Sequence, residues 1–299
     1  MKIAIAGFNG FIGNNFIFEY DNYIYENLTR SFLYSTNIFN NDIDGIINFI
    51  GKAHDIKSSK NFDEYYNVNF ELTKNLFDKF LISNANFFIT ISSIKAVADE
   101  SDFAVTEDFL PNPISDYGKT KLLAEEYILS KTIPVNKRVY ILRPTLVHGP
   151  GNRGNLNTLY NYVKKGLPWP LGKYNNKRSF CSLNNLTFII NELILNDKIS
   201  SGIYNICDDD PLSTNELIKI MSSSMKSNTK IWQMPKYFIK LLSFIGNIFN
   251  LSFRFENLDK LTLNFIVSNN KIKNAIKKPL PYSVIDGFKL TFNSLDNKF

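Results

Sequence analysis

Short apolar runs alternate with longer segments of helical periodicity in the first half of the chain. The apolar runs occupy residues 2–6, 46–50, 87–91 and 139–142. Between them, apolar positions recur at helical spacing over residues 11–20, 62–81 and 117–130. Fully apolar strands separated by helices are typical of a parallel sheet that is covered on both faces. Because crossovers between parallel strands are right-handed, we predict an α/β fold with a Rossmann-like, doubly wound parallel sheet.

The second half is patterned differently, because prolines and loops rich in Gly and Asn break it into shorter pieces. A strand is predicted over residues 203–206. A helix is predicted to begin near Ser213, a good N-cap residue, with Glu216 in its first turn. We therefore predict a dinucleotide-binding domain over residues 1–150. Residues 151–299 are predicted to form mainly a smaller, mixed, substrate-binding part, some segments of which return to the first domain.

The most apolar later stretch covers residues 237–253 and contains Lys240, Ser243, Asn247 and Asn250. It lacks the roughly 18 to 20 continuous apolar residues of a membrane span. Its apolar positions recur at helical spacing, which predicts a helix packed on a core. A helix lying on a membrane surface is the alternative, with only one positive charge in the stretch to support it. The apolar run at the N-terminus ends at Asn9, too early for a signal-peptide core.

Composition and charge narrow the class of protein. The 299 residues are 44% hydrophobic and 21% charged, which are globular proportions. Cys181 and Cys207 are the only cysteines, too few for a disulfide framework or a cysteine-rich zinc site, and this favours a reducing compartment. The net charge of +6 comes from scattered lysines without a run of five like charges, so we predict no nucleic-acid partner. A modest positive field also suits a small anionic substrate.

Three glycines, Gly7, Gly10 and Gly13, follow the first predicted strand and open the first predicted helix. In this context they permit a tight turn, a close approach to a pyrophosphate and close packing of helix on strand. An NAD site usually has an acidic residue about 20 residues further on, at the end of the second strand. Arg30 occupies that region here and suits a ribose 2′-phosphate, so we predict NADP before NAD.

A second group of residues points to proton transfer. Tyr117 and Lys121 are four residues apart and share one face of a predicted helix. An ammonium near a phenol favours the phenolate, so we expect Lys121 to lower the pKa of Tyr117. Ser93 follows the strand over residues 87–91, at the carboxyl edge where doubly wound sheets bind ligands. Together the three predict a site for interconverting a carbonyl and an alcohol.

With these motifs the sequence resembles the extended short-chain dehydrogenase/reductase family, and within it the NAD(P)-dependent nucleotide-sugar epimerases and dehydratases. The resemblance covers nearly the whole chain. It implies that Ser93, Tyr117 and Lys121 are catalytic and that Asn69 supports the cofactor site. The resemblance further implies that Arg143, Asn155 and Arg178 contact the substrate, with Arg178 on its diphosphate. Asn184 replaces the family's aspartate and His148 its tyrosine, and His148 is expected to line the mouth of the substrate site.

The resemblance leaves several activities open. Ile94 and Lys95 stand where 4,6-dehydratases of the group carry Asp and Glu, which argues against dehydration. We place first the 4-keto reduction of a UDP-4-keto-6-deoxy-N-acetylhexosamine in surface polysaccharide synthesis. A UDP-hexose or UDP-N-acetylhexosamine 4-epimerase is the alternative, and a non-catalytic dinucleotide-binding regulator is a minor one.

The partners and location follow from the same resemblance. We expect a UDP-sugar substrate, a cytoplasmic enzyme and no membrane span. A homodimer formed through the helices over residues 62–81 and 117–130 stays open. Neither His54, which we expect at a structural or rim position, nor any other residue lies in a cluster with metal-ligand spacing, so no metal is predicted.

Overall fold

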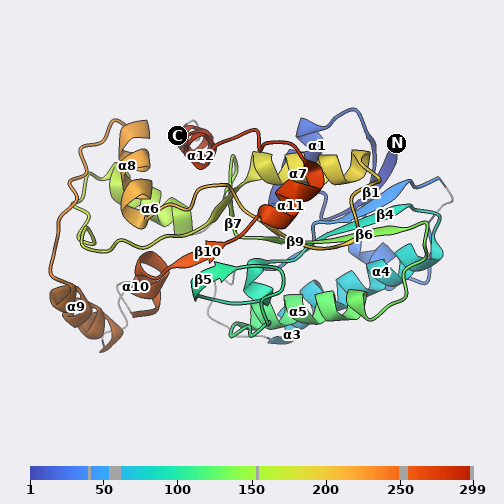
Figure 1. Cartoon of the computed structure of the whole chain (residues 1–299), viewed down its shortest axis with the longest axis horizontal. Helices are drawn as coiled ribbons and strands as arrows, with labels where there is room; N and C mark the ends of the chain where they lie inside the picture. The colour runs from blue at the N-terminus through green and yellow to red at the C-terminus, as the bar shows by residue number, and fades with distance from the viewer. Residues whose placement is uncertain (40–41, 54–61, 153–154, 249–254, 297–299) are drawn as a thin grey trace.

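The computed structural model describes residues 1–39, 42–53, 62–152, 155–248 and 255–296 (Figure 1). Its centre is a six-stranded parallel sheet with the order β2-β1-β3-β4-β6-β9. The strands are β1 (Lys2–Ala6), β2 (Ile24–Leu28), β3 (Gly45–Asn48), β4 (Phe87–Ile91), β6 (Arg138–Pro144) and β9 (Gly202–Ile206). From β1 the chain winds outward to β2 and then crosses to β3, so the switch point lies at the carboxyl ends of β1 and β3. The predicted Rossmann-like fold is confirmed.

Helices cover both faces of this sheet, as its fully buried inner strands require (Figure 1). One face is covered by α1 (Phe11–Glu19), α7 (Leu183–Leu195) and α11 (Asn270–Ile276). The other is covered by α2 (Arg30–Tyr34), α4 (Leu72–Ile82) and α5 (Asp116–Leu129). Two core layers result, one centred on Phe16 with Leu186 and the other on Phe77 with Phe88.

The helix predicted over residues 62–81 is present but irregular. It consists of α3 (Phe62–Tyr65), a π-helical turn η1 (Tyr66–Glu71) and α4. A π-turn adds one residue to the turn and often marks a functional site. Here it contains Asn69, whose side chain is fully buried.

The remaining elements form a smaller body beside the carboxyl edge of the sheet (Figure 1). Two short parallel pairs join β5 (Ser101–Val105) to β10 (Phe265–Val267) and β7 (Leu146–His148) to β8 (Phe180–Ser182). The short 3₁₀ helix η2 (Ile94–Ala96) follows β4. The other helices are α6 (Asn155–Lys164), α8 (Thr214–Ser224), α9 (Lys236–Ile248), α10 (Phe255–Thr262) and α12 (Val284–Asp296). Helix α8 begins with the expected cap, in which Ser213 and Glu216 satisfy each other's backbone N–H groups.

The strand predicted over residues 203–206 does not belong to this smaller body. It is β9, the edge strand of the main sheet, and pairs in parallel with β6 from Tyr140 opposite Gly202 to Pro144 opposite Ile206. Helices α7 and α11, also from the second half of the sequence, pack on the sheet. Among the described helices, none is both long and apolar enough to cross a lipid bilayer.

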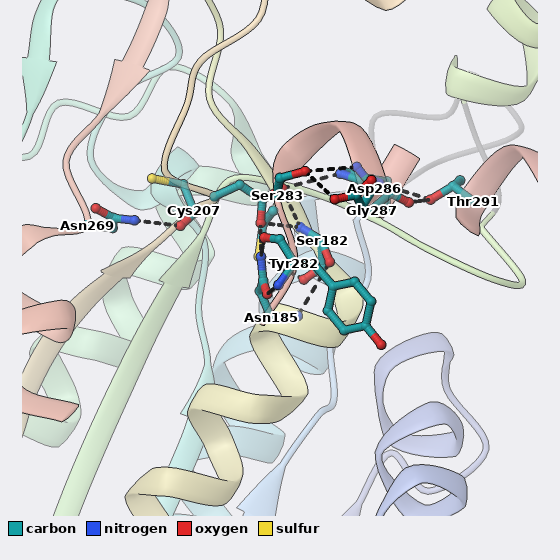
Figure 2. Close-up of polar contacts among 12 residues, drawn as sticks. Ser182, Asn185, Cys207, Asn269, Tyr282, Ser283, Asp286, Gly287 and Thr291 are labelled. Atoms are coloured by element: carbon teal, nitrogen blue, oxygen red, sulfur yellow. Dashed lines mark hydrogen bonds and ion pairs between the residues drawn. The ribbon is translucent and has the colours of Figure 1, made fainter. Parts of the chain in front are cut away.

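The C-terminal segment is fastened to the start of α7 by paired hydrogen bonds (Figure 2). The Asn185 amide donates to the Tyr282 carbonyl at 2.9 Å and accepts from the Tyr282 N–H at 3.1 Å. Ser283 then opens α12 by accepting from the Asp286 N–H at 3.2 Å. Gly287 allows α12 to approach β8, because a Cβ there would lie 2.8 Å from the Cβ of Ser182. Hydrogen bonds thus connect α7, which packs on the sheet, to the segment that leads into α12 of the smaller body.

Candidate active site

The glycine turn lies where β1 ends and α1 begins. Gly7 has a φ of +87°. The turn that follows it is closed by a 2.9 Å hydrogen bond from the Gly10 N–H to the Gly7 carbonyl. A Cβ on Gly7 would lie 2.9 Å from the carbonyl carbon of Phe49, and one on Gly13 would lie 2.5 Å from Gly7 O. Side chains at these positions would therefore collide with the backbone, so glycine is needed for this tight turn at the N-terminus of α1, where unpaired N–H groups attract phosphate. The residues present fit the pyrophosphate of a dinucleotide.

Arg30 lies at the predicted strand end. Strand β2 ends at Leu28, and Thr29 caps α2 by accepting from the Phe32 N–H at 3.3 Å. Arg30 is the first residue of that helix and is exposed. No carboxylate follows the strand at residues 29–31. The end of β2 therefore offers a cation, and no acid, beside the glycine turn of the neighbouring β1.

Lys121 is buried beneath the ends of two strands. Its ammonium donates to the carbonyl of Ile50, after β3, at 3.2 Å and to the carbonyl of Ile91, in β4, at 2.9 Å. Burial lowers the pKa of Lys121 to about 8, and nearby Glu125 partly opposes that shift. Gly51 leaves room for the ammonium, because a Cβ there would lie 3.1 Å from Nζ. Lys121 therefore holds two strand ends together from a buried position that disfavours its charged form.

Tyr117 and Ser93 meet because the start of α5 packs closely on the segment after β4. A Cβ on Gly118 would lie 2.2 Å from the carbonyl oxygen of Lys95, so only glycine permits this contact. Ser93 accepts from the Lys95 N–H at 3.2 Å and begins η2. Burial raises the pKa of Tyr117, and its hydrogen bond with Ser93 acts in the opposite direction.

The expected effect of Lys121 on Tyr117 is not seen in this structure. Lys121 directs its ammonium to two backbone carbonyls, and it is not among the groups that shift the pKa of Tyr117. The expectation that Lys121 lowers this pKa stays a prediction. Burial of the phenolate has the largest influence on the pKa of Tyr117 in this structure.

Asn69 supports the same site from the π-turn. Its side-chain oxygen accepts from the Lys52 N–H at 2.8 Å, and its amide donates to the Lys52 carbonyl at 3.2 Å. The amide also donates to the Thr120 hydroxyl at 3.1 Å, one residue before Lys121. One buried asparagine thus connects the loop after β3 to α5. The structure therefore brings Asn69 together with Ser93, Tyr117 and Lys121.

Arg143, which is predicted to contact the substrate, is paired with a buried carboxylate instead of being free on the surface of the site. Its guanidinium is buried and makes a paired contact with Glu125, with Nε lying 3.1 and 3.0 Å from the two carboxylate oxygens. The Ser92 hydroxyl donates to the same carboxylate. Sequence reasoning missed Glu125, although it follows Lys121 by four residues and therefore shares its helix face. The predicted substrate contact of Arg143 stays a prediction.

Arg178 lies near the segment after β4. Its guanidinium donates to the Leu263 carbonyl at 3.3 Å and lies 5.8 Å from the ring centre of Phe265. The Lys95 ammonium lies 5.5 Å from the same ring, which places Arg178 near the residues that follow Ser93. Burial lowers the pKa of Arg178. Asn155 is the first residue of α6, but its side chain and the whole of His54 lie outside the described residues.

His148 does not line a substrate mouth, so that expectation is wrong. Its side chain is completely buried and stacks on Phe288, with ring centres 3.8 Å apart. Nδ1 lies 2.9 Å from the Thr291 hydroxyl, and Nε2 lies 3.6 Å from Asp208. Burial lowers the pKa of His148 and keeps it neutral at pH 7. The described residues contain no group of three or more His, Cys, Asp or Glu able to hold a metal ion.

A glycine cradle at the switch point, with a serine, a tyrosine and a buried lysine at the neighbouring strand ends, defines a dinucleotide-dependent enzyme acting on an alcohol or carbonyl. The family model described as "NAD dependent epimerase/dehydratase family" matches residues 3–207, and the chain belongs to this family. The predicted family and the nicotinamide dinucleotide, NAD or NADP, are thereby confirmed.

Similar proteins include several 4-epimerases. A UDP-glucose 4-epimerase of Vibrio cholerae is 30% identical over 253 residues, which cover 82% of this chain and 75% of that protein. An N-acetyl-alpha-D-glucosaminyl-diphospho-ditrans,octacis-undecaprenol 4-epimerase of Escherichia coli O157:H7 is 26% identical over 70% of this chain and 61% of its own length. The solved UDP-glucuronic acid 4-epimerase of Bacillus cereus has the same fold, with a TM-score of 0.73, 19% identity and coverage of 100% of this chain and 99% of that one.

Proposed function

We propose that this protein is a UDP-hexose or UDP-N-acetylhexosamine 4-epimerase. The observation that carries the proposal is the 30% identity to the Vibrio cholerae UDP-glucose 4-epimerase over a region that includes the whole cluster around Tyr117. The comparisons favour this activity over the 4-keto reductase that the sequence alone placed first. Both activities need the same protein groups, which is why the motifs do not separate them.

In this proposal the protein moves one proton on the sugar. Tyr117 takes the proton of the C4 hydroxyl as the 4-keto sugar forms and returns it after the sugar has turned over. Ser93 hydrogen-bonds the same oxygen and orients it, and such fixed donors cost no reorganisation during the reaction. The contact between Ser93 and Tyr117 supports these roles.

A bound NAD would supply the hydride acceptor for sugar C4 and the hydride for the return step. The glycine turn from Gly7 to Gly13 would hold its pyrophosphate at the start of α1. Lys121 would hold the nicotinamide ribose, because its ammonium already lies at the ends of β3 and β4, where it donates to the Ile50 and Ile91 carbonyls. Asn69 keeps the loop after β3 fixed against α5, so that the ribose meets a rigid surface.

The substrate side of the site is proposed to be built mainly from residues 151–299. Arg178 would bind the diphosphate through charge-assisted hydrogen bonds, and its place near Lys95 supports this role. Asn155 at the start of α6 is proposed as a sugar contact. Arg143 is proposed to act on the substrate side through Glu125 and Ser92, because its own guanidinium is engaged by Glu125.

The decisive experiment supplies the purified protein with UDP-glucose, and separately with UDP-N-acetylglucosamine, without added cofactor. We expect the 4-epimer to form from at least one of them, measured by anion-exchange chromatography. With deuterium at sugar C4 we expect the label to stay in the product, because the hydride returns to the carbon that it left. Product that has lost the label to solvent, or no product from either sugar, would overturn the proposal.

A second candidate, the 4-keto reductase, is supported by Arg30. An exposed cation at the end of β2, without a carboxylate, suits the 2′-phosphate of NADPH. A reductase consumes one NADPH for each sugar, whereas an epimerase returns its cofactor unchanged. Oxidation of NADPH in step with a UDP-4-keto-6-deoxy sugar, without any epimerisation, identifies the reductase.

A further inference from the structure

Basic residues are scattered along the whole chain, but one segment has no acidic residues to balance them. Residues 217–255 contain six lysines and arginines and no aspartate or glutamate. Because the whole chain has 34 basic and 28 acidic residues, all other residues together contain 28 of each and balance. The +6 charge is therefore concentrated between the start of α8 and the start of α10. The exposed cations of the described part of this segment are Lys219, Lys226, Lys230, Lys236 and Lys240.

Helix α9 lies in the middle of this cationic segment and exposes an apolar face. Tyr237, Leu241 and Phe244 are exposed by 75, 52 and 54%. Their spacing of four and three residues places them on one side of the helix. Ile239 points the opposite way and is completely buried in the core of the smaller body. The helix is therefore anchored by one face and presents aromatic and aliphatic side chains on the other.

The position of α9 leaves this face accessible. In Figure 1 the helix lies at the far end of the smaller body from the six-stranded sheet, with α10 between it and β10. Lys236 and Lys240 border the apolar face along one side, since they are four residues apart on the same helix. A cationic border beside an exposed face of Tyr, Leu and Phe is the composition of helices that lie in a membrane interface.

We propose that α9 docks this protein on an anionic lipid surface, with Tyr237, Leu241 and Phe244 inserted among the lipids. Exposed apolar groups are stabilised when they leave water for lipid. Each lysine near an anionic membrane adds electrostatic attraction. Neither contribution alone gives firm binding, but the two coincide on this helix. The proposal is independent of the reaction at Tyr117.

Charge decides between a lipid surface and a second copy of the chain. In a symmetric dimer the same patch meets itself, so two copies of the cationic segment would be brought close to each other. Such a contact brings like charges together, whereas an anionic bilayer neutralises them. A nucleic acid would satisfy the lysines but would leave the apolar face in water. The lipid surface is the occupant that satisfies both properties.

Vesicle sedimentation tests the proposal with the full chain. The protein is mixed with vesicles of phosphatidylcholine alone and with vesicles of equal parts phosphatidylcholine and phosphatidylglycerol, and pelleted. We expect at least tenfold stronger partitioning into the phosphatidylglycerol vesicles, weakened by high salt. Equal partitioning into both compositions, or none into either, overturns the proposal.

Two sets of variants locate the contact. The triple variant Tyr237→Ser, Leu241→Ser, Phe244→Ser is expected to lose at least tenfold in partitioning, and Lys236→Gln with Lys240→Gln severalfold. The matched control replaces three exposed apolar helix residues elsewhere, Phe18, Ile82 and Leu195, by serine. The control is expected to bind as the wild type does. Equal loss in both triple variants, or no loss in either, contradicts an α9 contact.

A spectroscopic measurement covers the case in which a triple variant folds poorly. The chain has two tryptophans, of which Trp169 is buried and Trp232 is 52% exposed. Tyr237→Trp in a Trp232→Phe background places one reporter on the helix face. We expect its fluorescence to shift to shorter wavelength with anionic vesicles and to be quenched by brominated lipid. If the reporter stays unquenched, and if the protein forms a dimer that is lost when Phe244 is replaced by serine, the face belongs to a second copy instead. The dimer is measured from the molecular mass in solution.

Discussion

Two buried polar clusters lie beside the carboxyl edge of the sheet, and they differ in whether their polar groups reach the surface or contact only the protein interior. The first, called here the tyrosine cluster, contains Ser93, Tyr117, Lys121, Glu125 and Arg143. The second, called here the histidine cluster, contains His148, Ser182, Asn185, Asp208 and Thr291. Both join elements that are distant in the sequence, and both hide ionisable groups from water. Burial of charge alone therefore does not distinguish a reactive site from a structural one.

The histidine cluster is closed on itself. Asp208 accepts from the Ser182 N–H at 3.0 Å and from the Asn185 amide at 2.7 Å, while His148 is stacked on Phe288. In the tyrosine cluster, by contrast, Tyr117 is partly exposed, and burial lowers the pKa of Lys121 to about 8. A strongly lowered pKa beside a group that reaches the surface is the combination expected of a reactive site.

The largest effect is expected from Tyr117→Phe. Loss of the phenolic proton should lower turnover by about 10² to 10⁴. Binding of the dinucleotide, measured by calorimetry, should change little, because the phenol is not part of the glycine cradle. The matched variant Thr291→Val removes a hydroxyl from the histidine cluster and should leave turnover intact. If Tyr117→Phe retains activity within a few-fold of the wild type, the tyrosine cluster is not the reactive one.

The next largest effect is expected from Glu125→Ala. This change leaves the Arg143 guanidinium buried without its carboxylate, which typically costs about 3–5 kcal/mol of stability. Chemical unfolding of the variant measures the loss. The double variant Glu125→Leu, Arg143→Met removes both charges and should recover most of it. A single variant as stable as the wild type would show that the ion pair does not support the tyrosine cluster.

A smaller effect is expected from Gly118→Ala. The new methyl group would overlap the Lys95 carbonyl, whose oxygen lies 2.2 Å from the Cβ position. Overpacking of this kind costs about 1–3 kcal/mol. Because the contact aligns Ser93 with Tyr117, turnover should fall more than thermal stability does. Gly172→Ala, another crowded glycine but far from both clusters, serves as the control and should lower stability only.

Sequence alone predicted the inner strands of the sheet and the proximity of Ser93, Tyr117 and Lys121, for a physical reason. Strands such as Phe87–Ile91 are buried on both faces and read as continuous apolar runs, so their limits follow directly from hydropathy. Ser93, Tyr117 and Lys121 carry their signal locally, through a strand end and a four-residue spacing. Glu125 carried the same helical spacing but belonged to no recognised motif, and so it was missed.

The histidine cluster could not be predicted in this way. His148 meets Thr291 across 143 residues, and nothing in the neighbouring sequence indicates the partner. A histidine in a loop beside a substrate motif therefore suggested the substrate mouth, whereas packing of Phe288 placed it in the core. Local patterns reveal elements and short motifs, but they do not reveal which distant helix covers a given side chain.

The smallest effect is expected from His148→Gln, in the pH dependence of the free energy of unfolding. The buried His148 has a pKa lowered from its ordinary value of 6.5, so the folded protein resists its protonation while the unfolded chain does not. Above pH 6.5 the group is neutral in both states and contributes nothing to the pH dependence. As pH falls below 6.5 the unfolded chain takes up the proton first, and the free energy of unfolding decreases by about 1.4 kcal/mol for each unit of pKa difference.

His148→Gln keeps a polar side chain but removes this titration, so the stability of the variant should fall less steeply between neutral and mildly acid pH. Urea unfolding at several pH values compares the two slopes, and His54 is present in both proteins and cancels. Parallel slopes would mean that His148 is protonated as readily in the fold as in the unfolded chain. The histidine cluster would then be open to protons, and its contrast with the tyrosine cluster would disappear.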